Sequence, residues 1–100
     1  MIRVEITEEA QQDIDNIEEF LLQNWNEKVL LNFYDKLENA ITILESGKVF
    51  FEKYEDTKYR KFLLTKHNTM ICDVRADVLY VLRVINNFQN PEDNYESISK

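Results

Sequence analysis

The stretch YRKFLLTKHNTMICDVRADVLYVLRVI, residues 59–85, decides the fold, because short apolar runs follow one another in it with only brief polar breaks. We expect three strands here, YRKFLLTK, TMICDVR and VLYVLRVI, connected at residues 67–68 and 76–77. Connections this short favour antiparallel hairpin pairing. The stretch therefore predicts a three-stranded antiparallel meander.

The N-terminal residues show two other patterns. In MIRVEI, residues 1–6, apolar and charged side chains alternate, which is typical of a half-buried strand. After Thr7, which can cap a helix, apolar residues recur at spacings of three and four as far as Leu21. We therefore expect an N-terminal strand and then a helix that reaches roughly to Asn24.

A second apolar stripe indicates a second helix. Asn26 can cap this helix, the stripe runs from Leu30 to Leu44, and Gly47 is a typical helix stop. Only a few residues around Trp25 separate the two helices, so they should form an antiparallel hairpin. The whole order predicts an α+β fold in which this hairpin covers one face of a small sheet.

The composition bounds the number of domains and the location. The chain has 100 residues, 44% of them hydrophobic, with a single Gly and a single Pro. We expect one domain, residues 1–92, followed by a polar tail at residues 93–100. Neither a secretion signal nor a run long enough to cross a bilayer is visible. The single cysteine, Cys72, has no internal disulfide partner, which favours a cytoplasmic protein that does not contact a membrane.

The net charge of −7 is unevenly distributed. Residues 1–50 hold 11 acids and 4 bases, whereas residues 58–75 hold five bases against Asp73 alone. Proteins that bind nucleic acid over a large surface are usually basic, since phosphate neutralisation dominates their affinity. The overall charge therefore argues against a large nucleic-acid interface and leaves room for a small basic site.

The single cysteine and most of the aromatic residues are interpreted as structural residues. Cys72 lies in an expected strand with Met70 and Val74 on the same side, and burial there would make its thiol inert. No set of His, Cys and carboxylate residues has metal-ligand spacing, so we expect no metal and no other cofactor. Most aromatic residues are expected to pack between the helices or to close the core; those of the helices are Phe20, Trp25, Phe33 and Tyr34.

Four short motifs, in their order along the chain, resemble one family. They are T-x-x-A at 7–10 followed by Asp13, F-L-L-Q-N-W at 20–25, Y-R-K-F-L-L at 59–64 and Q-N-P at 89–91. Together they resemble the RelE/ParE superfamily of toxins from type II toxin–antitoxin systems. The match is closest to the ParE-like, plasmid-stabilisation branch.

The resemblance covers about residues 1–92 and implies a small bacterial toxin with an α+β sandwich fold. A cognate antitoxin would hold it inactive by wrapping its C-terminal segment around it. ParE-like members poison DNA gyrase by binding it, which is the activity that the resemblance favours here. RelE-like members are metal-independent endoribonucleases that cleave mRNA on the ribosome. Many ParE-like proteins have His or Asp, and then Arg, where this chain has Asn86 and Phe88. A homologue that is no longer toxic and only binds its antitoxin is therefore a third alternative.

Two arginines are the first candidates for a site. Arg60 lies in the Y-R motif and either contacts phosphate, carboxylate or a partner, or forms a salt bridge to an acid of the helices. Strict alternation would place Arg83 on the strand face of Val81 and Ile85. Because an unpaired buried charge is costly, Arg83 must either reach an open face as a site residue or pair with an acid such as Asp73.

The remaining candidates belong to the two modes of action. A nuclease would use cations and a general base, for which the catalytic candidates are Arg60, Lys66, His67 and Arg83. A lone histidine at a turn is more often a solvated loop residue, and this interpretation is favoured for His67. Candidates for binding a target or partner are Arg60, Arg83, Asn86, Phe88 and Gln89. The edge strand at residues 2–6 can pair with a second copy or with an antitoxin segment, which allows a homodimer or a toxin–antitoxin hetero-oligomer.

Overall fold

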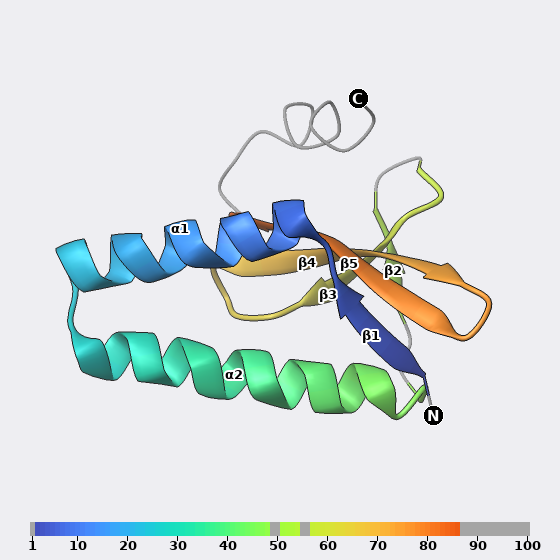
Figure 1. The fold of residues 1–100 in the computed structure, drawn as a ribbon, viewed down its shortest axis with the longest axis horizontal. Coiled ribbons are helices and arrows are strands. Elements are labelled where there is room, and N and C mark those ends of the chain that lie inside the picture. Colours follow the sequence, from blue (N-terminus) through green and yellow to red (C-terminus); the bar gives the residue numbers. More distant parts are fainter. Residues whose placement is uncertain (1, 49–50, 55–56, 87–100) are drawn as a thin grey trace.

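Two layers make up the protein: a helical hairpin and the five-stranded sheet that it covers on one face (Figure 1). The computed structural model describes residues 2–48, 51–54 and 57–86. Its elements are β1 (Arg3–Ile6), α1 (Glu8–Asn24), α2 (Glu27–Glu45), β2 (Glu52–Lys53), β3 (Arg60–Leu63), β4 (Asn68–Arg75) and β5 (Val78–Asn86). The α+β class, the N-terminal strand, the helical hairpin and the antiparallel meander are all confirmed. Predictions at Phe88, Gln89 and residues 93–100 lie outside the described residues.

Both helices begin and end where the sequence predicts. The Thr7 hydroxyl oxygen accepts the Ala10 N–H at 3.2 Å, and Asn26 Oδ1 accepts the Val29 N–H at 3.0 Å. Each cap therefore satisfies a backbone donor that the first helical turn leaves without a partner. Just past α2, Gly47 has a φ of 71°, a left-handed conformation that glycine adopts without steric cost.

The strands lie in the order β1-β5-β4-β3-β2. The pairs β2–β3, β3–β4 and β4–β5 are antiparallel, whereas β1 runs parallel to β5, with Arg3 opposite Val78. The predicted turn at residues 76–77 is confirmed. The other connection is shifted from its predicted place, because Asn68 already begins β4. The short β2 was not predicted, since a two-residue strand has no readable periodicity.

An irregularity in β5 overturns one prediction about Arg83. Ile71 of β4 lies opposite Arg83 but the next residue, Cys72, lies opposite Val81, so Leu82 is an extra residue in β5. Such a bulge interrupts the alternation of faces. Val81 therefore faces the helices, whereas Arg83 shares the opposite face with Ile71. The prediction that Arg83 and Val81 share a face was wrong.

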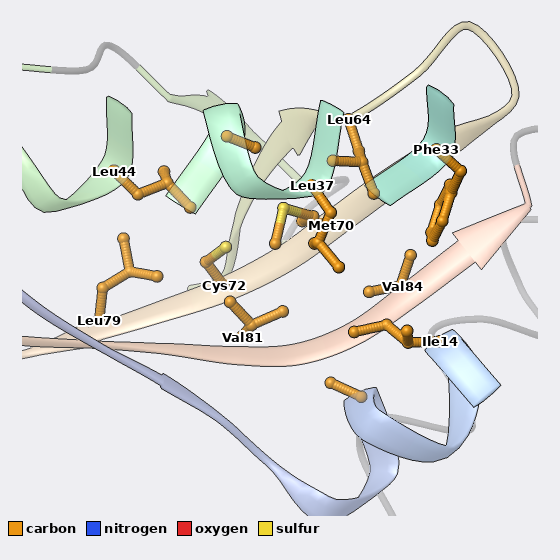
Figure 2. Close-up of a cluster of buried hydrophobic side chains, with 12 residues drawn as sticks. Ile14, Phe33, Leu37, Leu44, Leu64, Met70, Cys72, Leu79, Val81 and Val84 are labelled. Atoms are coloured by element: carbon orange, nitrogen blue, oxygen red, sulfur yellow. The ribbon is translucent and has the colours of Figure 1, made fainter. Parts of the chain in front are cut away.

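Buried apolar side chains form two clusters, one on each face of the sheet. The larger lies between the sheet and the helices (Figure 2); its members include Ile14, Phe33, Leu37, Leu44, Leu64, Met70, Cys72, Leu79, Val81 and Val84. The smaller consists of Tyr54, Ile71 and Ile85, with Tyr59 packed against it. Cys72 has no exposed surface, and burial raises the pKa of its thiol to about 12. Its interpretation as a core residue is confirmed, and the raised pKa supports the prediction that its thiol is inert.

No helix in the described ranges has the length and apolar character needed to cross a membrane.

Candidate functional site at the end of the helical hairpin

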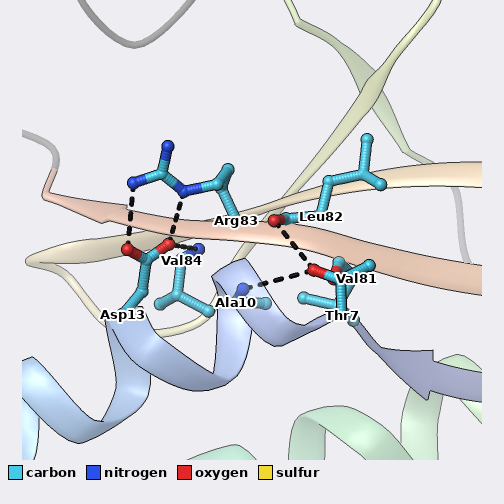
Figure 3. Close-up of polar contacts among 7 residues, drawn as sticks. All are labelled: Thr7, Ala10, Asp13, Val81, Leu82, Arg83 and Val84. Carbon is cyan, nitrogen blue, oxygen red and sulfur yellow. Dashed lines mark hydrogen bonds and ion pairs between the residues drawn. The ribbon is translucent and has the colours of Figure 1, made fainter. Parts of the chain in front are cut away.

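Side chains at the start of α1 cover the edge of β5 where β1 ends. Pairing between β1 and β5 stops at Val81. Beyond that residue the Thr7 hydroxyl donates to the Val81 carbonyl at 3.0 Å, with the Leu82 carbonyl at 3.1 Å (Figure 3). Asp13 Oδ2 then accepts the Val84 N–H at 2.9 Å. Thr7 and Asp13 therefore take the place of a neighbouring strand along this part of β5.

Asp13 also pairs with Arg83 through both carboxylate oxygens. Arg83 Nε lies 2.7 Å from Oδ2 and Nη2 lies 2.9 Å from Oδ1 (Figure 3). The two side chains are only 25% and 13% exposed. The hydrogen bonding of Arg83 to the Asp13 carboxylate is the largest of the causes that raise the pKa of Arg83. The predicted pairing of Arg83 with Asp73 was wrong. Arg83 pairs with Asp13, and Asp73 accepts instead from Arg75 Nε at 2.8 Å.

Next to this ion pair lies a groove of about 790 Å³ between the helices, the β3–β4 turn and the end of β5. It is lined by Asp13, Asn16, Ile17, Phe20, Leu21, Trp25, Val29, Asn32, Phe33, Lys36, Thr65, Lys66, His67, Asn68, Arg83, Val84, Ile85 and Asn86. The helical residues among them recur at three- and four-residue spacings, so each helix contributes one stripe. The connected ends of α1 and α2 extend beyond the sheet in Figure 1, and lining residues such as Leu21, Trp25 and Val29 belong to those ends.

The exposure of two aromatic side chains in the groove contradicts a prediction. Trp25 is 64% exposed and Phe20 is 57% exposed, so neither is packed in the core, whereas Phe33 is buried as expected. From the sequence, most of the aromatic residues, these three among them, are assigned to helix packing or to closure of the core. Position in the sequence could have indicated their exposure. Trp25 lies in the connection between the helices and Phe20 lies close before it, and this connection is the part of the hairpin farthest from the sheet.

The turn between β3 and β4 presents Lys66 and His67 at the groove. The Thr65 hydroxyl oxygen accepts the His67 N–H at 3.0 Å and its hydroxyl donates to Asn68 Oδ1, also at 3.0 Å. The Leu64 N–H donates to the Asn68 carbonyl at 3.0 Å. These bonds fix the backbone of the turn, while Lys66 and His67 themselves are exposed.

The structure brings together four of the candidate residues. Lys66, His67, Arg83 and Asn86 all line the groove. Arg60 does not; it is exposed in β3, and its Nη1 donates to the Lys58 carbonyl at 3.2 Å. Phe88 and Gln89 lie outside the described residues, so their placement stays a prediction. Within the part of the chain that is described, no cluster of three His, Cys, Asp or Glu residues has the geometry to hold a metal ion.

Comparison with solved structures identifies the class of fold: it is that of the RelE/ParE-like toxins. A chain of the chromosomal ParDE toxin–antitoxin system from P. aeruginosa is 16% identical and superposes with a TM-score of 0.74, covering 86% of this chain and 96% of that one. A copper-bound mutant toxin from Helicobacter pylori, 18% identical, gives a TM-score of 0.62 over 87% of this chain and 96% of its own. A conserved hypothetical protein from the same organism, also 18% identical, gives 0.56 with the same coverage. No protein-family model and no curated protein matches the sequence.

Proposed function

We propose that this protein is the toxin of a type II toxin–antitoxin system, that it acts by binding a protein target such as DNA gyrase, and that a cognate antitoxin neutralises it. The observation that carries the proposal is the fold shared with a chain of a ParDE system over 96% of that chain. The groove supports a binding function, because it combines exposed aromatic side chains with cations, and such surfaces mark interaction sites.

The state of Arg83 favours binding over RNA cleavage. A metal-independent nuclease needs cations that are ready to hold the scissile phosphate. Arg83 directs two of its nitrogen atoms at Asp13 and is only 25% exposed. A cation held in this way serves to attach α1 to β5.

A second candidate function is an endoribonuclease, and one specific observation favours it. Lys66 and His67 lie side by side on the turn and share the groove with Arg83. A histidine beside two cations supplies the residue types that general base catalysis on a phosphodiester uses. In this mechanism His67 would take the proton of the attacking 2′-hydroxyl as its oxygen bonds to phosphorus. The bond from phosphorus to the 5′-oxygen would break, and that oxygen would leave with a proton from solvent, while Lys66 stabilises the charge on the phosphate.

Expression of this chain alone in a bacterial host tests the proposal. We expect growth arrest with broken chromosomal DNA and intact mRNA, and we expect the purified protein to trap a cleaved plasmid on purified gyrase. Arrest with loss of mRNA that a Lys66→Ala/His67→Ala variant abolishes would replace the proposal with the nuclease. Both residues are exposed, so this variant should fold.

A Phe88→Arg variant in the same host addresses the homologue that only binds its antitoxin. If the natural chain is harmless at confirmed soluble expression while Phe88→Arg arrests growth, residue 88 has removed toxicity and the proposed activity is wrong. If the natural chain arrests growth, that alternative is excluded.

A further inference from the structure

The outer edge of β1 carries backbone groups that pair with no other strand among the described residues. β1 is the last strand on its side of the sheet, next to β5 (Figure 1). The Thr7 N–H donates to the Val81 carbonyl of β5, and the Arg3 N–H donates to the residue before β5, both at 3.1 Å. In a parallel pair, alternate residues of a strand bond to the neighbouring strand. The N–H and C=O groups of Val4 and Ile6 therefore point away from β5, towards the open edge.

The charged side chains on this edge strand have opposite signs. Exposed strand edges attract other strands, and proteins usually protect them with charge. Arg3 and Glu5 are 69% and 47% exposed and pair with each other at 3.0 Å. They lie on the face of the sheet away from the helices, because Val4 between them packs against the core. Two like charges would repel a second copy of the strand, whereas one charge of each sign allows two copies to attract each other.

The order of these charges selects one register. Antiparallel pairing of two copies of β1 about a two-fold axis that is centred on Arg3 or on Glu5 places that residue opposite itself, so like charges meet, which is destabilising. A centre at Ile6 shifts Arg3 beyond the end of the other strand. A centre at Val4 places Arg3 of each copy opposite Glu5 of the other, so opposite charges meet twice. Residues 2–6, Ile-Arg-Val-Glu-Ile, are symmetric about Val4 in this sense, with Ile2 opposite Ile6.

The backbone favours the same centre. Because Val4 faces the open edge, each Val4 N–H reaches the Val4 carbonyl of the other copy in this register, and the two residues form a hydrogen-bonded pair. Each Ile6 N–H reaches the Ile2 carbonyl of the other copy. The Ile2 N–H is already donated to the Glu45 carbonyl at 3.0 Å, so the end of α2 limits the pairing to these contacts.

We infer that two copies of this chain associate through antiparallel pairing of their β1 strands, centred on Val4. Residues that lie opposite each other in a sheet point to the same face, so both helical hairpins lie on one side of a continuous sheet. The interface is short, which places it among the weak and transient ones. The inference does not rest on the proposed function, since none of the residues of this interface lines the groove.

Sedimentation equilibrium of the full chain, from roughly 10 μM to 1 mM, tests the association, and we expect a monomer–dimer equilibrium. Arg3→Glu and Glu5→Arg should each weaken it roughly tenfold or more, because each places like charges opposite one another. The Arg3→Glu/Glu5→Arg exchange should restore it. A mixture of the two single variants should also restore it, since opposite charges then meet again. Lys28→Glu reverses an exposed charge of α2 and, as the control, should leave the association unchanged.

Engineered cysteines test the register itself. In the inferred register, residue 3 of one copy and residue 5 of the other form a non-hydrogen-bonded pair with Cα atoms about 4.5 Å apart, which a disulfide can bridge. Under mild oxidation, a mixture of Arg3→Cys and Glu5→Cys chains should therefore give a cross-linked heterodimer. Equivalent residues of the two copies are diagonal neighbours, roughly 7–8 Å apart, so either variant alone should cross-link much less. Cys72 has no exposed surface and does not compete in the folded chain.

Three results would overturn the inference. A chain that stays monomeric across the whole range and gives no heterodimer disulfide leaves the edge to a different partner. Preferential cross-linking of Arg3→Cys chains to one another means a different register. Association that the charge reversals at β1 do not weaken, or that Lys28→Glu weakens equally, means that another surface joins the copies. Arg3 and Glu5 are exposed, so these variants should fold, and urea unfolding of each checks that they do.

Discussion

Arg83 and Asp13 join the last described strand to the first helix through two parallel hydrogen bonds, of 2.7 Å and 2.9 Å. The same carboxylate accepts the Val84 N–H at 2.9 Å. One acidic side chain thus pairs with a guanidinium and also completes the backbone hydrogen bonding of β5. Stability should therefore depend strongly on it.

Replacement of Asp13 by alanine should destabilise the fold by roughly 2–4 kcal/mol, since it leaves a half-buried guanidinium and a strand N–H without their acceptor. Urea unfolding of the purified variant measures this loss. Asp13→Asn should cost less, because an amide oxygen can still accept from Val84.

The control for this prediction is Asp15→Ala on the same helix. Asp15 is exposed and accepts only from the Gln11 side chain among the hydrogen bonds described, so its removal should leave the unfolding midpoint almost unchanged. A double-mutant cycle with Arg83→Met then isolates the pair. A coupling energy near zero would show that Asp13 and Arg83 act independently, contrary to the geometry.

Thr7 should matter more than an ordinary N-cap. Its hydroxyl oxygen caps α1 at Ala10 while its hydroxyl hydrogen is donated to the Val81 carbonyl. Thr7→Val keeps the shape and loses both bonds, and we expect a loss of about 1–2 kcal/mol by thermal or urea unfolding. Thr7→Ser should restore most of it. Thr42→Val, at an exposed threonine whose hydroxyl donates to the Glu38 carbonyl within α2, should be nearly neutral; an equal loss there would point to β-branching or solvation as the cause.

Local sequence patterns were sufficient to predict the helices and strands that have regular periodicity. Thr7, Asn26 and Gly47 mark helix boundaries through their own side-chain or backbone chemistry, and the short connection at 76–77 predicts a hairpin. These features depend on residues close in sequence. The order of the elements correctly gave the arrangement of the layers, with a hairpin over one face of the sheet, and the family resemblance implied the same fold.

Such local patterns could not predict the features that depend on residues far apart in sequence. The bulge at Leu82 occurs within an unbroken apolar run, so nothing local indicates that the faces exchange before Arg83. The choice of Asp13 over Asp73 as the partner depends on where α1 crosses β5. The groove likewise depends on the length of the hairpin relative to the sheet, so Phe20 and Trp25 resemble core residues in sequence alone.

Exchange of Ala and Gly at two positions with positive φ should change the stability of the fold in opposite directions. Ala76 has a φ of 55° and Gly47 has a φ of 71°. Ala76→Gly removes the left-handed strain of a side chain and should stabilise the fold by up to about 1 kcal/mol, after the greater entropy of glycine in the unfolded chain is subtracted.

Gly47→Ala should destabilise by about 1 kcal/mol through the backbone alone. An added Cβ there meets only Ile2 at 3.5 Å, which is an ordinary contact. Urea unfolding of both variants checks the pair. Two changes of the same sign would be inconsistent with backbone strain as the cause.

Alkaline pH should destabilise the fold through Cys72. Burial raises the pKa of its thiol from the ordinary value of 9.0 to about 12. Between these values the folded chain keeps a proton that the unfolded chain loses, so the free energy of unfolding falls as pH rises, by about 1.4 kcal/mol per pH unit from this group. Below the lower value the contribution is fully present.

Urea unfolding of the natural chain and of Cys72→Ala across this window measures the effect. The variant should start less stable, because of the cavity, and should show a shallower decline with pH. Parallel declines would assign the pH dependence to other groups, such as Tyr34, whose pKa is also raised by burial. At neutral pH a thiol reagent should label Cys72 only in the unfolded chain.

The parallel pairing of β1 with β5 has a consequence for how the chain folds during synthesis. Arg3 and Val78 are neighbours in the sheet although most of the chain separates them. The helical hairpin leaves the ribosome long before β5, so its apolar stripes are synthesised well before this strand of the sheet on which they pack. A nascent chain arrested before residue 78 should be sensitive to proteolysis, because the sheet can close only after β5 has left the ribosome.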